Sequence, residues 1–133
     1  MGKLISPQDI AKAGTEHAHQ VAVFVWAGLN ATKYPELRMM FAIPNGGLRD
    51  KITASNLKAE GVKAHVPDIF LPVSRGRWHG LFIEMKKPGK YQIDPGQLEY
   101  IEKLHKSDYG ARVCIGWEQA VETLISYLEY DGG

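Results

Sequence analysis

The chain alternates short apolar runs with segments in which apolar side chains recur every three or four positions. The first pattern is typical of strands and the second of amphipathic helices. The predicted strands are residues 39–44, 68–73, 80–86 and 111–117, and the predicted helices are residues 16–31, 49–61, 94–107 and 118–130. The order α-β-α-β-β-α-β-α predicts an α/β fold in which a mixed β-sheet is flanked by α-helices.

Capping and turn residues set the boundaries of these segments. Thr15 and Asp94 are predicted N-caps, because their side-chain oxygens can accept hydrogen bonds from the first turn of a helix. Gly61 is predicted to end the second helix. The strand at 39–44 is expected to be short and buried, and to end before the turn signal Asn45–Gly47.

Length and composition fit one globular domain. With 133 residues, 44% hydrophobic and 23% charged, we expect a single domain over 1–133 with a loosely ordered segment at 1–14. No apolar run approaches the roughly 20 residues of a membrane span, and the start lacks the apolar block of a signal peptide. A cytoplasmic location without membrane contact is therefore expected. Cys114 lies in an apolar run and is expected in the core.

Positive charge is distributed unevenly along the chain. The formal net charge is +1, but residues 117–133 carry four acidic and no basic side chains, which leaves 16 basic against 11 acidic residues before them. A local excess of positive charge can contact phosphates, although a solvated charged surface explains it equally well. The residues of this excess are Arg75, Arg77, Lys86, Lys87 and Lys90.

The segment Ser74–His79 combines two arginines with an aromatic ring. Arg75 and Arg77 flank a glycine, and such a tip can clamp phosphates while Trp78 stacks on an unpaired base. The alternative is that Trp78 packs beneath the loop or into a dimer interface. Four further aromatic residues are candidates for an interface or for the core: Trp26, Trp117, Tyr127 and Tyr130.

Three charged residues lie in or beside the apolar strands of the predicted hairpin. If the turn centres on Gly76, Asp68 lies opposite Glu84, and directly opposed carboxylates repel each other unless a cation lies between them. Mg²⁺ takes such oxygen ligands. Lys86 shares the face of Glu84 and can stabilise negative charge on a phosphodiester, so this group suits phosphodiester hydrolysis. The alternative is a buried salt bridge between Lys86 and one of the acids, with the other acid exposed.

The spacing of these residues also resembles a known motif. Pro67–Asp68 followed by Glu84–Lys86 looks like the PD-(D/E)xK nuclease motif. The segments at 44–47, 57–71, 80–89 and 96–104 are together similar, in order and spacing, to the VRR-NUC family, including its stand-alone members encoded by bacteriophages. The resemblance runs from about residue 15 to the last helix and implies a restriction-endonuclease-like core.

The resemblance implies roles for the motif residues. It makes Asp68 and Glu84 the metal carboxylates, the backbone carbonyl of Met85 a further ligand and Lys86 the catalytic lysine. The implied cofactor is Mg²⁺, with Mn²⁺ as the alternative.

Residues outside the motif also match family positions. Gln97 matches a glutamine that lies beside the site, and Glu16 an acid that reaches the metal directly or through water, with Gln20 on the same face. The alternatives are a surface glutamine and an ordinary acid in a first helical turn. His65 departs from the family, which usually has a glycine there; it could fill space near the cleft, touch DNA or be a surface imidazole.

The family resemblance implies a metal-dependent, structure-selective DNA endonuclease, in host-cell cytoplasm if virus-encoded. A Holliday-junction resolvase acting as a homodimer on branched DNA is the preferred hypothesis, because symmetric cuts need two sites related by a two-fold axis. The alternatives are a flap or nicking nuclease working with a partner, and a non-catalytic DNA-binding module. The intact set of Asp68, Glu84 and Lys86 argues against the binding module.

Overall fold

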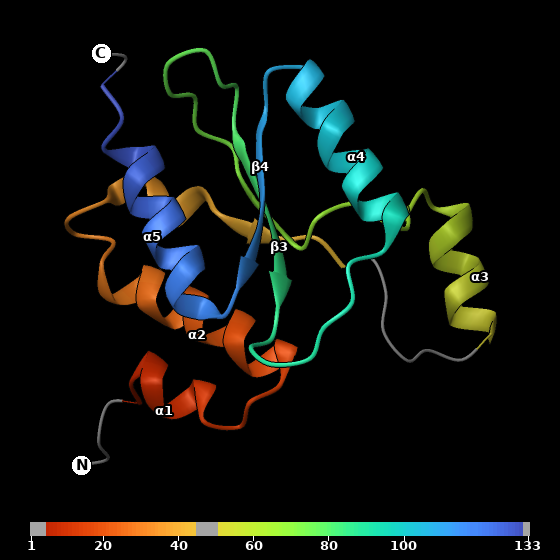
Figure 1. The fold of residues 1–133 in the computed structure, drawn as a ribbon, viewed down its shortest axis with the longest axis horizontal. Coiled ribbons are helices and arrows are strands. Elements are labelled where there is room, and N and C mark those ends of the chain that lie inside the picture. Colours follow the sequence, from red (N-terminus) through yellow and green to blue (C-terminus); the bar gives the residue numbers. More distant parts are fainter. Residues whose placement is uncertain (1–4, 45–50, 132–133) are drawn as a thin grey trace.

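A mixed β-sheet forms the centre of the computed structural model, which describes residues 5–44 and 51–131 (Figure 1). Within these residues the sheet has four strands in the order β1-β2-β3-β4. The pairings β1–β2 and β2–β3 are antiparallel, whereas β3 and β4 are parallel. The strands are β1 (Phe41–Ala42), β2 (Ile69–Leu71), β3 (Leu81–Lys86) and β4 (Gly110–Ile115).

Helices cover both faces of the sheet, as the sequence predicts. In Figure 1, α2 and α5 lie on one side of β3 and β4, and α4, which connects these two strands, lies on the other. The mixed α/β fold is therefore confirmed. The helices are α1 (Pro7–Ala11), α2 (Glu16–Leu29), the 3₁₀ helix η1 (Pro35–Met39), α3 (Lys51–Ala59), α4 (Pro95–Lys106) and α5 (Trp117–Leu128).

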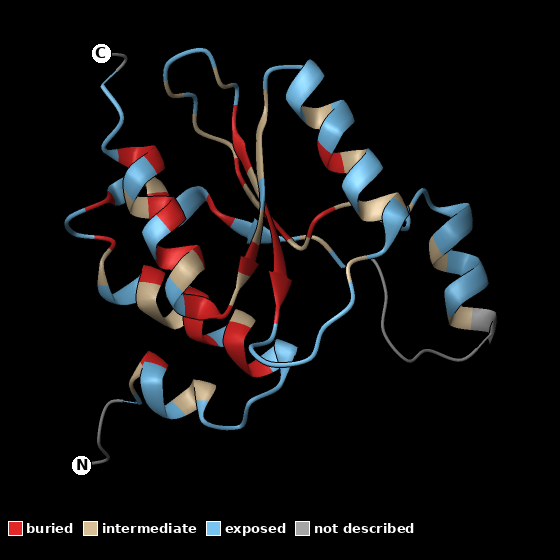
Figure 2. Cartoon of the chain, viewed as in Figure 1, coloured by how far each residue is buried: buried red, intermediate tan, exposed pale blue. Residues whose placement is uncertain are grey.

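The core fills the space between the sheet and the pair α2 and α5. Buried residues in Figure 2 gather along β3 and along the facing sides of these two helices, whereas α3 is largely exposed. Apolar side chains from the sheet, from α2 and from α5 fill this space, because the sheet and both helices turn their apolar positions toward it. Fully or almost fully buried members include Val23, Ile69, Ile83, Met85, Cys114 and Leu124.

Most predicted boundaries are confirmed by hydrogen bonds and backbone angles. The hydroxyl of Thr15 accepts a hydrogen bond from the Ala18 amide at 3.0 Å, which caps α2. Asp94 caps α4 in the same way. Gly61 has a φ of +101° just beyond α3, and Gly76 a φ of +55° in the hairpin turn, a region that L side chains avoid.

Three expectations differ from the structure. The strand predicted at 39–44 is only the two-residue β1, and it is exposed rather than buried, because it lies at the sheet edge and pairs only with β2. Helix α1 lies within the segment expected to be loosely ordered, and η1 was not predicted. Both are five residues long, too short for a clear apolar period. The turn predicted at Asn45–Gly47 lies outside the described residues.

The hairpin has the predicted register. Phe70 lies opposite Phe82, and their rings stack with centroids 4.2 Å apart. Ile69 lies opposite Ile83, so extending the ladder by one residue brings Asp68 opposite the next residue of β3, Glu84.

The outer edge of β4 is covered by side chains. The carbonyl of Ala111 accepts a hydrogen bond from the His105 ring at 2.8 Å, and the amide of Ile115 donates to the side-chain oxygen of Gln119 at 2.8 Å. Part of the hydrogen-bonding capacity of this edge is thereby used within the chain.

The aromatic residues considered for an interface have different surroundings. Trp117 and Tyr127 are buried in the core, and Trp26 packs against it, whereas Tyr130 is exposed. Trp117 and Tyr127 are therefore intramolecular. None of the described helices is long and apolar enough to cross a membrane.

Candidate active site

Three carboxylates converge at one end of the sheet. Glu16 is the first residue of α2, Asp68 directly precedes β2, and Glu84 lies in β3. One carboxylate oxygen from each lies within 4.8 Å of the others. Helix α2 begins beside the carboxyl end of β3, and this placement brings Glu16 to the pair on the hairpin (Figure 1).

Glu84 is the most deeply buried member of this carboxylate cluster, with 2% of its surface exposed. Its Oε2 accepts a hydrogen bond from Gln97 at 2.8 Å and lies 3.4 Å from the ammonium of Lys86. Its Oε1 is buried and has no hydrogen-bond partner among the described residues. Burial, followed by the charge of Asp68, raises the pKa of Glu84 to about 8 although Lys86 acts in the opposite direction.

The other two carboxylates share this environment. Oδ2 of Asp68 accepts a hydrogen bond from the amide of Met85 at 2.7 Å, and burial nevertheless raises the pKa of Asp68. The pKa of Glu16 is also raised, first by burial and then by the nearby Asp68. The charge of Asp68 therefore makes ionisation of both Glu16 and Glu84 less favourable.

The carboxylate cluster fits a divalent cation. Carboxylate oxygens are the ligands that Mg²⁺, Mn²⁺ and Ca²⁺ prefer, and the buried Oε1 of Glu84 is an acceptor without a donor. A cation would offset the cost of burying these carboxylates, which raises the pKa of all three, and the repulsion of Glu16 and Glu84 by Asp68. Charge compensation by Lys86 alone is incomplete, because a single ammonium faces three acids.

Lys86 is buried with 7% of its surface exposed, and it lies on the same face of β3 as Glu84. The salt bridge that the sequence left as an alternative is therefore present. However, Asp68 is not the separate, exposed acid of that alternative, because it belongs to the same cluster. The arrangement combines a salt bridge at Oε2 of Glu84 with a buried Oε1 that has no hydrogen-bond partner among the described residues.

The comparisons with known proteins agree with this geometry. A family model described as the VRR-NUC domain matches residues 7–117. This chain belongs to the VRR-NUC family. A solved structure titled "VRR_NUC domain protein" is 32% identical, with a TM-score of 0.74 over 89% of this chain and 93% of that one. No match was found among curated proteins. The chain is thus a nuclease-type domain with a PD-(D/E)xK-like fold.

In this VRR-NUC domain, the carbonyl of Met85 points toward the carboxylates. The carbonyls of Gly80 and Lys86 accept hydrogen bonds from the β4 side, from Gly110 and Gly116, at 2.8 Å each. Because successive carbonyls of a strand point in opposite directions, that of Met85 points toward β2. The ladder position opposite it is Pro67, which has no N–H to donate.

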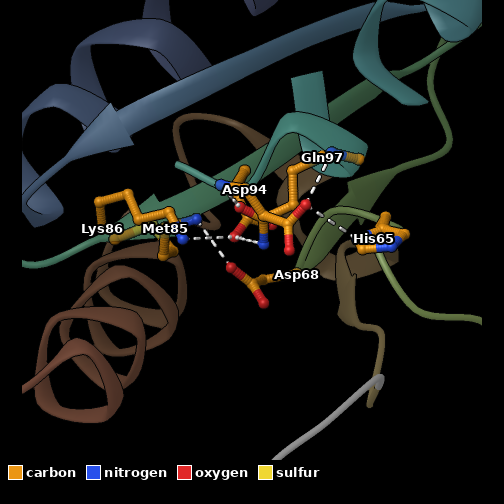
Figure 3. A network of polar contacts seen from close by, with 8 residues as sticks. His65, Asp68, Met85, Lys86, Asp94 and Gln97 are labelled. Carbon is orange, nitrogen blue, oxygen red and sulfur yellow. Dashed lines mark hydrogen bonds and ion pairs between the residues drawn. The ribbon is translucent and has the colours of Figure 1, made fainter. Parts of the chain in front are cut away.

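Gln97 is oriented by the cap of α4 (Figure 3). Its Oε1 accepts a hydrogen bond from the Asp94 amide at 3.3 Å, so its Nε2 is directed to Glu84. The side chain of Asp94 completes this capping box by accepting from Gly96 at 2.6 Å. The family resemblance places Gln97 beside the site, whereas the second role of Asp94, orienting Gln97, follows only from these hydrogen bonds.

His65 supports the same end of α4. Its φ is +73°, the left-handed region that favours glycine, which gives a physical reason for the glycine usual at this family position. The imidazole lies over Gly96, where an added Cβ would approach the ring to 2.7 Å, and Nδ1 is 3.7 Å from Asp94. The side chain is 43% exposed, so His65 packs on Gly96 and is also the surface imidazole that the sequence analysis considered.

A cleft of about 620 Å³ opens beside the carboxylate cluster. It is formed by Glu16 from α2 and by the end of β3 with the loop that follows. Lys87 and Lys90, predicted as DNA contacts, both line it. Its side-chain lining is Glu16, Lys86, Lys87, Lys90, Tyr91 and Gln92.

Arg75, predicted to contact DNA phosphates at the hairpin tip, is bound within the chain. Its guanidinium pairs with Glu36 and donates to the carbonyls of Leu128 at 3.2 Å and Ser74 at 2.8 Å. These partners use three of the five N–H donors of a guanidinium, and a phosphate contact by Arg75 stays a prediction. The contacts tie the hairpin tip to η1 and α5.

Arg77 is exposed at the same tip, and its guanidinium lies 4.2 Å from the centre of the Trp78 ring. Trp78 packs against the hydrophobic core rather than standing free. The tip lies at the opposite end of β3 from the carboxylate cluster (Figure 1). Arg77 and Trp78 therefore do not line the cleft beside the carboxylates.

Proposed function

We propose that this VRR-NUC domain is a metal-dependent DNA endonuclease that hydrolyses phosphodiester bonds in branched DNA. The observation that carries the proposal is the buried, unpartnered Oε1 of Glu84 within the cluster of three carboxylates. Such a group destabilises the metal-free protein and is retained where a cation is to be bound. A cleft lined by lysines next to it offers a place for the DNA backbone.

The proposed ligands are Asp68, Glu84 and the carbonyl of Met85, with Glu16 reaching the ion directly or through water. A bound Mg²⁺, or Mn²⁺ in its place, would polarise the phosphodiester and activate water as the nucleophile. Support for this assignment comes from the oxygen-only donor set and from the direction of the Met85 carbonyl.

The remaining residues have roles that follow from their positions. The ammonium of Lys86 is held at the cluster and can stabilise negative charge that develops on the phosphate. Gln97 holds one oxygen of Glu84 in place, so the other faces the cluster. Lys87 and Lys90 can bind flanking phosphates from the wall of the cleft.

Branched DNA cut by a homodimer, as in a Holliday-junction resolvase, is the finer form of this proposal. The described residues hold one carboxylate cluster, and symmetric cuts across a junction need two. A second copy would supply the other. A flap or nicking nuclease acting with a partner is the alternative and needs one cluster only.

The test is cleavage of a panel of labelled four-way, flap, splayed and linear DNAs with Mg²⁺. We expect the four-way junction to be cut fastest, by paired nicks, and an Asp68→Asn variant to bind it without cutting. Sedimentation equilibrium should report about twice the monomer mass. A monomer that makes single nicks would establish the nicking alternative, and no cleavage of any DNA would refute the proposal.

A further inference from the structure

The loop between β3 and α4 places an aromatic ring in the cleft beside the carboxylates. Tyr91 is 41% exposed, and it lines the cleft together with Glu16 and Lys86. We propose that Tyr91, with Lys87 and Lys90, forms a subsite for an unpaired nucleotide next to the scissile phosphate. The ring stacks on the base and the two ammonium groups hold the phosphates. This inference rests on the proposed function and specifies its substrate.

The charge of the cleft suits a nucleic-acid strand. Its lining holds three lysines and one acid, Glu16. Lys86 is engaged with Glu84, but neither Lys87 nor Lys90 forms a salt bridge within the part of the chain that the structure describes. These two ammonium groups are therefore available to phosphates, because no salt bridge has to be broken before a phosphate binds.

The ring of Tyr91 adds a stacking surface for a base, which the lysines alone do not provide. Tyr91 takes part in none of the ring contacts found among residues 5–44 and 51–131. Aromatic rings combined with a cationic groove are the usual platform for single-stranded nucleic acid, because every base has a π-face to stack. A base within an intact duplex has both faces covered by its neighbours, so only an unpaired base can stack on Tyr91.

The backbone of the loop supports this placement. Gly89 has a φ of +92° between the two lysines, and this left-handed residue turns the chain after Pro88. The turn returns Lys90 and Tyr91 to the cleft that Lys87 also lines. Trp78, for which the sequence analysis considered both base stacking and packing beneath the loop, has Arg77 over its ring and is absent from this lining.

The experiment measures DNA binding without metal, so that it is independent of cleavage. Fluorescence anisotropy in EDTA compares two DNAs of equal length. One is a duplex with three unpaired thymidines in its centre, called the gapped DNA below, and the other is fully paired. Tyr91→Ala should weaken binding of the gapped DNA by about 5- to 100-fold, the range for loss of one stacked base, and leave the paired duplex unchanged. Tyr91→Phe keeps the ring and should bind both DNAs like the unmodified protein.

Tyr130→Ala is the matched control, since Tyr130 is similarly exposed at 45% but lies outside the cleft. It should change neither affinity. Equal weakening of both DNAs by Tyr91→Ala, no weakening, or a Tyr91→Phe variant as weak as Tyr91→Ala would each overturn the inference, as would failure of the unmodified protein to bind either DNA.

The binding experiment tests the nucleotide subsite separately from the proposed endonuclease activity. If the tyrosine-dependent preference for gapped DNA is found but Mg²⁺ supports no cleavage, the subsite stands and the endonuclease proposal fails. If Mg²⁺-dependent cleavage is found but Tyr91→Ala still distinguishes the two DNAs as the unmodified protein does, the subsite fails alone.

Discussion

The two ends of the β2–β3 hairpin both carry charged residues, but only one end satisfies them. At the tip, Arg75 is paired with Glu36 and bonded to the Leu128 carbonyl, and the Tyr127 hydroxyl donates to Val73 at 2.5 Å. At the other end, Glu84 keeps a buried oxygen without a partner among the described residues. One end of the hairpin is anchored, whereas the other is held in an unfavourable electrostatic state.

The difference shows where stability and chemistry are located in this domain. Charges whose partners lie within the chain tie elements together, as Arg75 ties the tip to α5. Glu84, in contrast, keeps one buried oxygen without a hydrogen bond although Lys86 and Gln97 contact the other, and its pKa is strongly raised, as is common at functional sites. The anchored tip restrains the strands that keep Asp68 beside Glu84, so the first region makes the second possible.

The largest expected effect is that of Glu84→Gln on cleavage. Removing this carboxylate should lower the single-turnover rate by about 10³-fold or more, above the roughly 10–100-fold typical of residues that only orient a ligand. Gln97→Ala, which removes such an orienting contact, is the matched comparison and should fall in that smaller range. Equal losses in the two variants would contradict the assignment of Glu84 as a ligand.

Lys86→Met should lower the single-turnover rate by about 10²-fold, the scale of deleting one group that stabilises transition-state charge. The substitution keeps an unbranched apolar side chain at a buried position, so the fold should persist. Calorimetric titration with Mg²⁺ should still detect binding. Unfolding of this variant would instead favour a purely structural salt bridge with Glu84.

The stability of the metal-free protein should fall as pH rises. The pKa of Glu84 is raised from 4.5 to about 8, so between these values the folded state binds the proton more tightly than the unfolded state. The free energy of unfolding in EDTA should therefore decrease from pH 5 to pH 8, by about 3–4 kcal/mol. Denaturant titrations at four pH values measure this slope. Glu84→Gln should flatten it, and added Mg²⁺ should stabilise the protein more at pH 8 than at pH 5.

The smallest expected effects are those at the tip. Arg75→Ala should destabilise the protein by about 1–2 kcal/mol, because it removes hydrogen bonds to Glu36 and Leu128, and should leave Mg²⁺ binding unchanged. Arg77→Ala is the matched control and should stay within about 0.5 kcal/mol, since this arginine is exposed. A lower slope of DNA affinity against salt in Arg75→Ala would show that the tip contacts phosphates after all.

The sequence predicted the paired carboxylates because short-range rules set their geometry. A turn at Gly76 fixes the register, strand alternation puts Glu84 and Lys86 on one face, and the cap at Thr15 starts the helix that brings Glu16. The assignment of roles came from the resemblance to the family and remains a prediction for each residue.

Features that depend on distant partners could not be predicted in this way. Arg75 contacts Glu36 and Leu128 only when η1 and α5 are packed beside the tip, and no local sequence pattern predicts such contacts. The exposure of β1 likewise follows from its place in the strand order. Tyr91 lies in a loop without periodicity, so its position in the cleft appears only in three dimensions.

The covered edge of β4 limits how copies of this chain can assemble. A second copy that extended the sheet through β4 would first have to displace His105 from Ala111 and Gln119 from Ile115. Among residues 5–44 and 51–131, the opposite edge offers only the two residues of β1. A very short edge strand and side chains bonded to an edge both disfavour strand addition and edge-to-edge aggregation. Self-association of this domain is consequently expected to use helices and loops, with each sheet remaining separate.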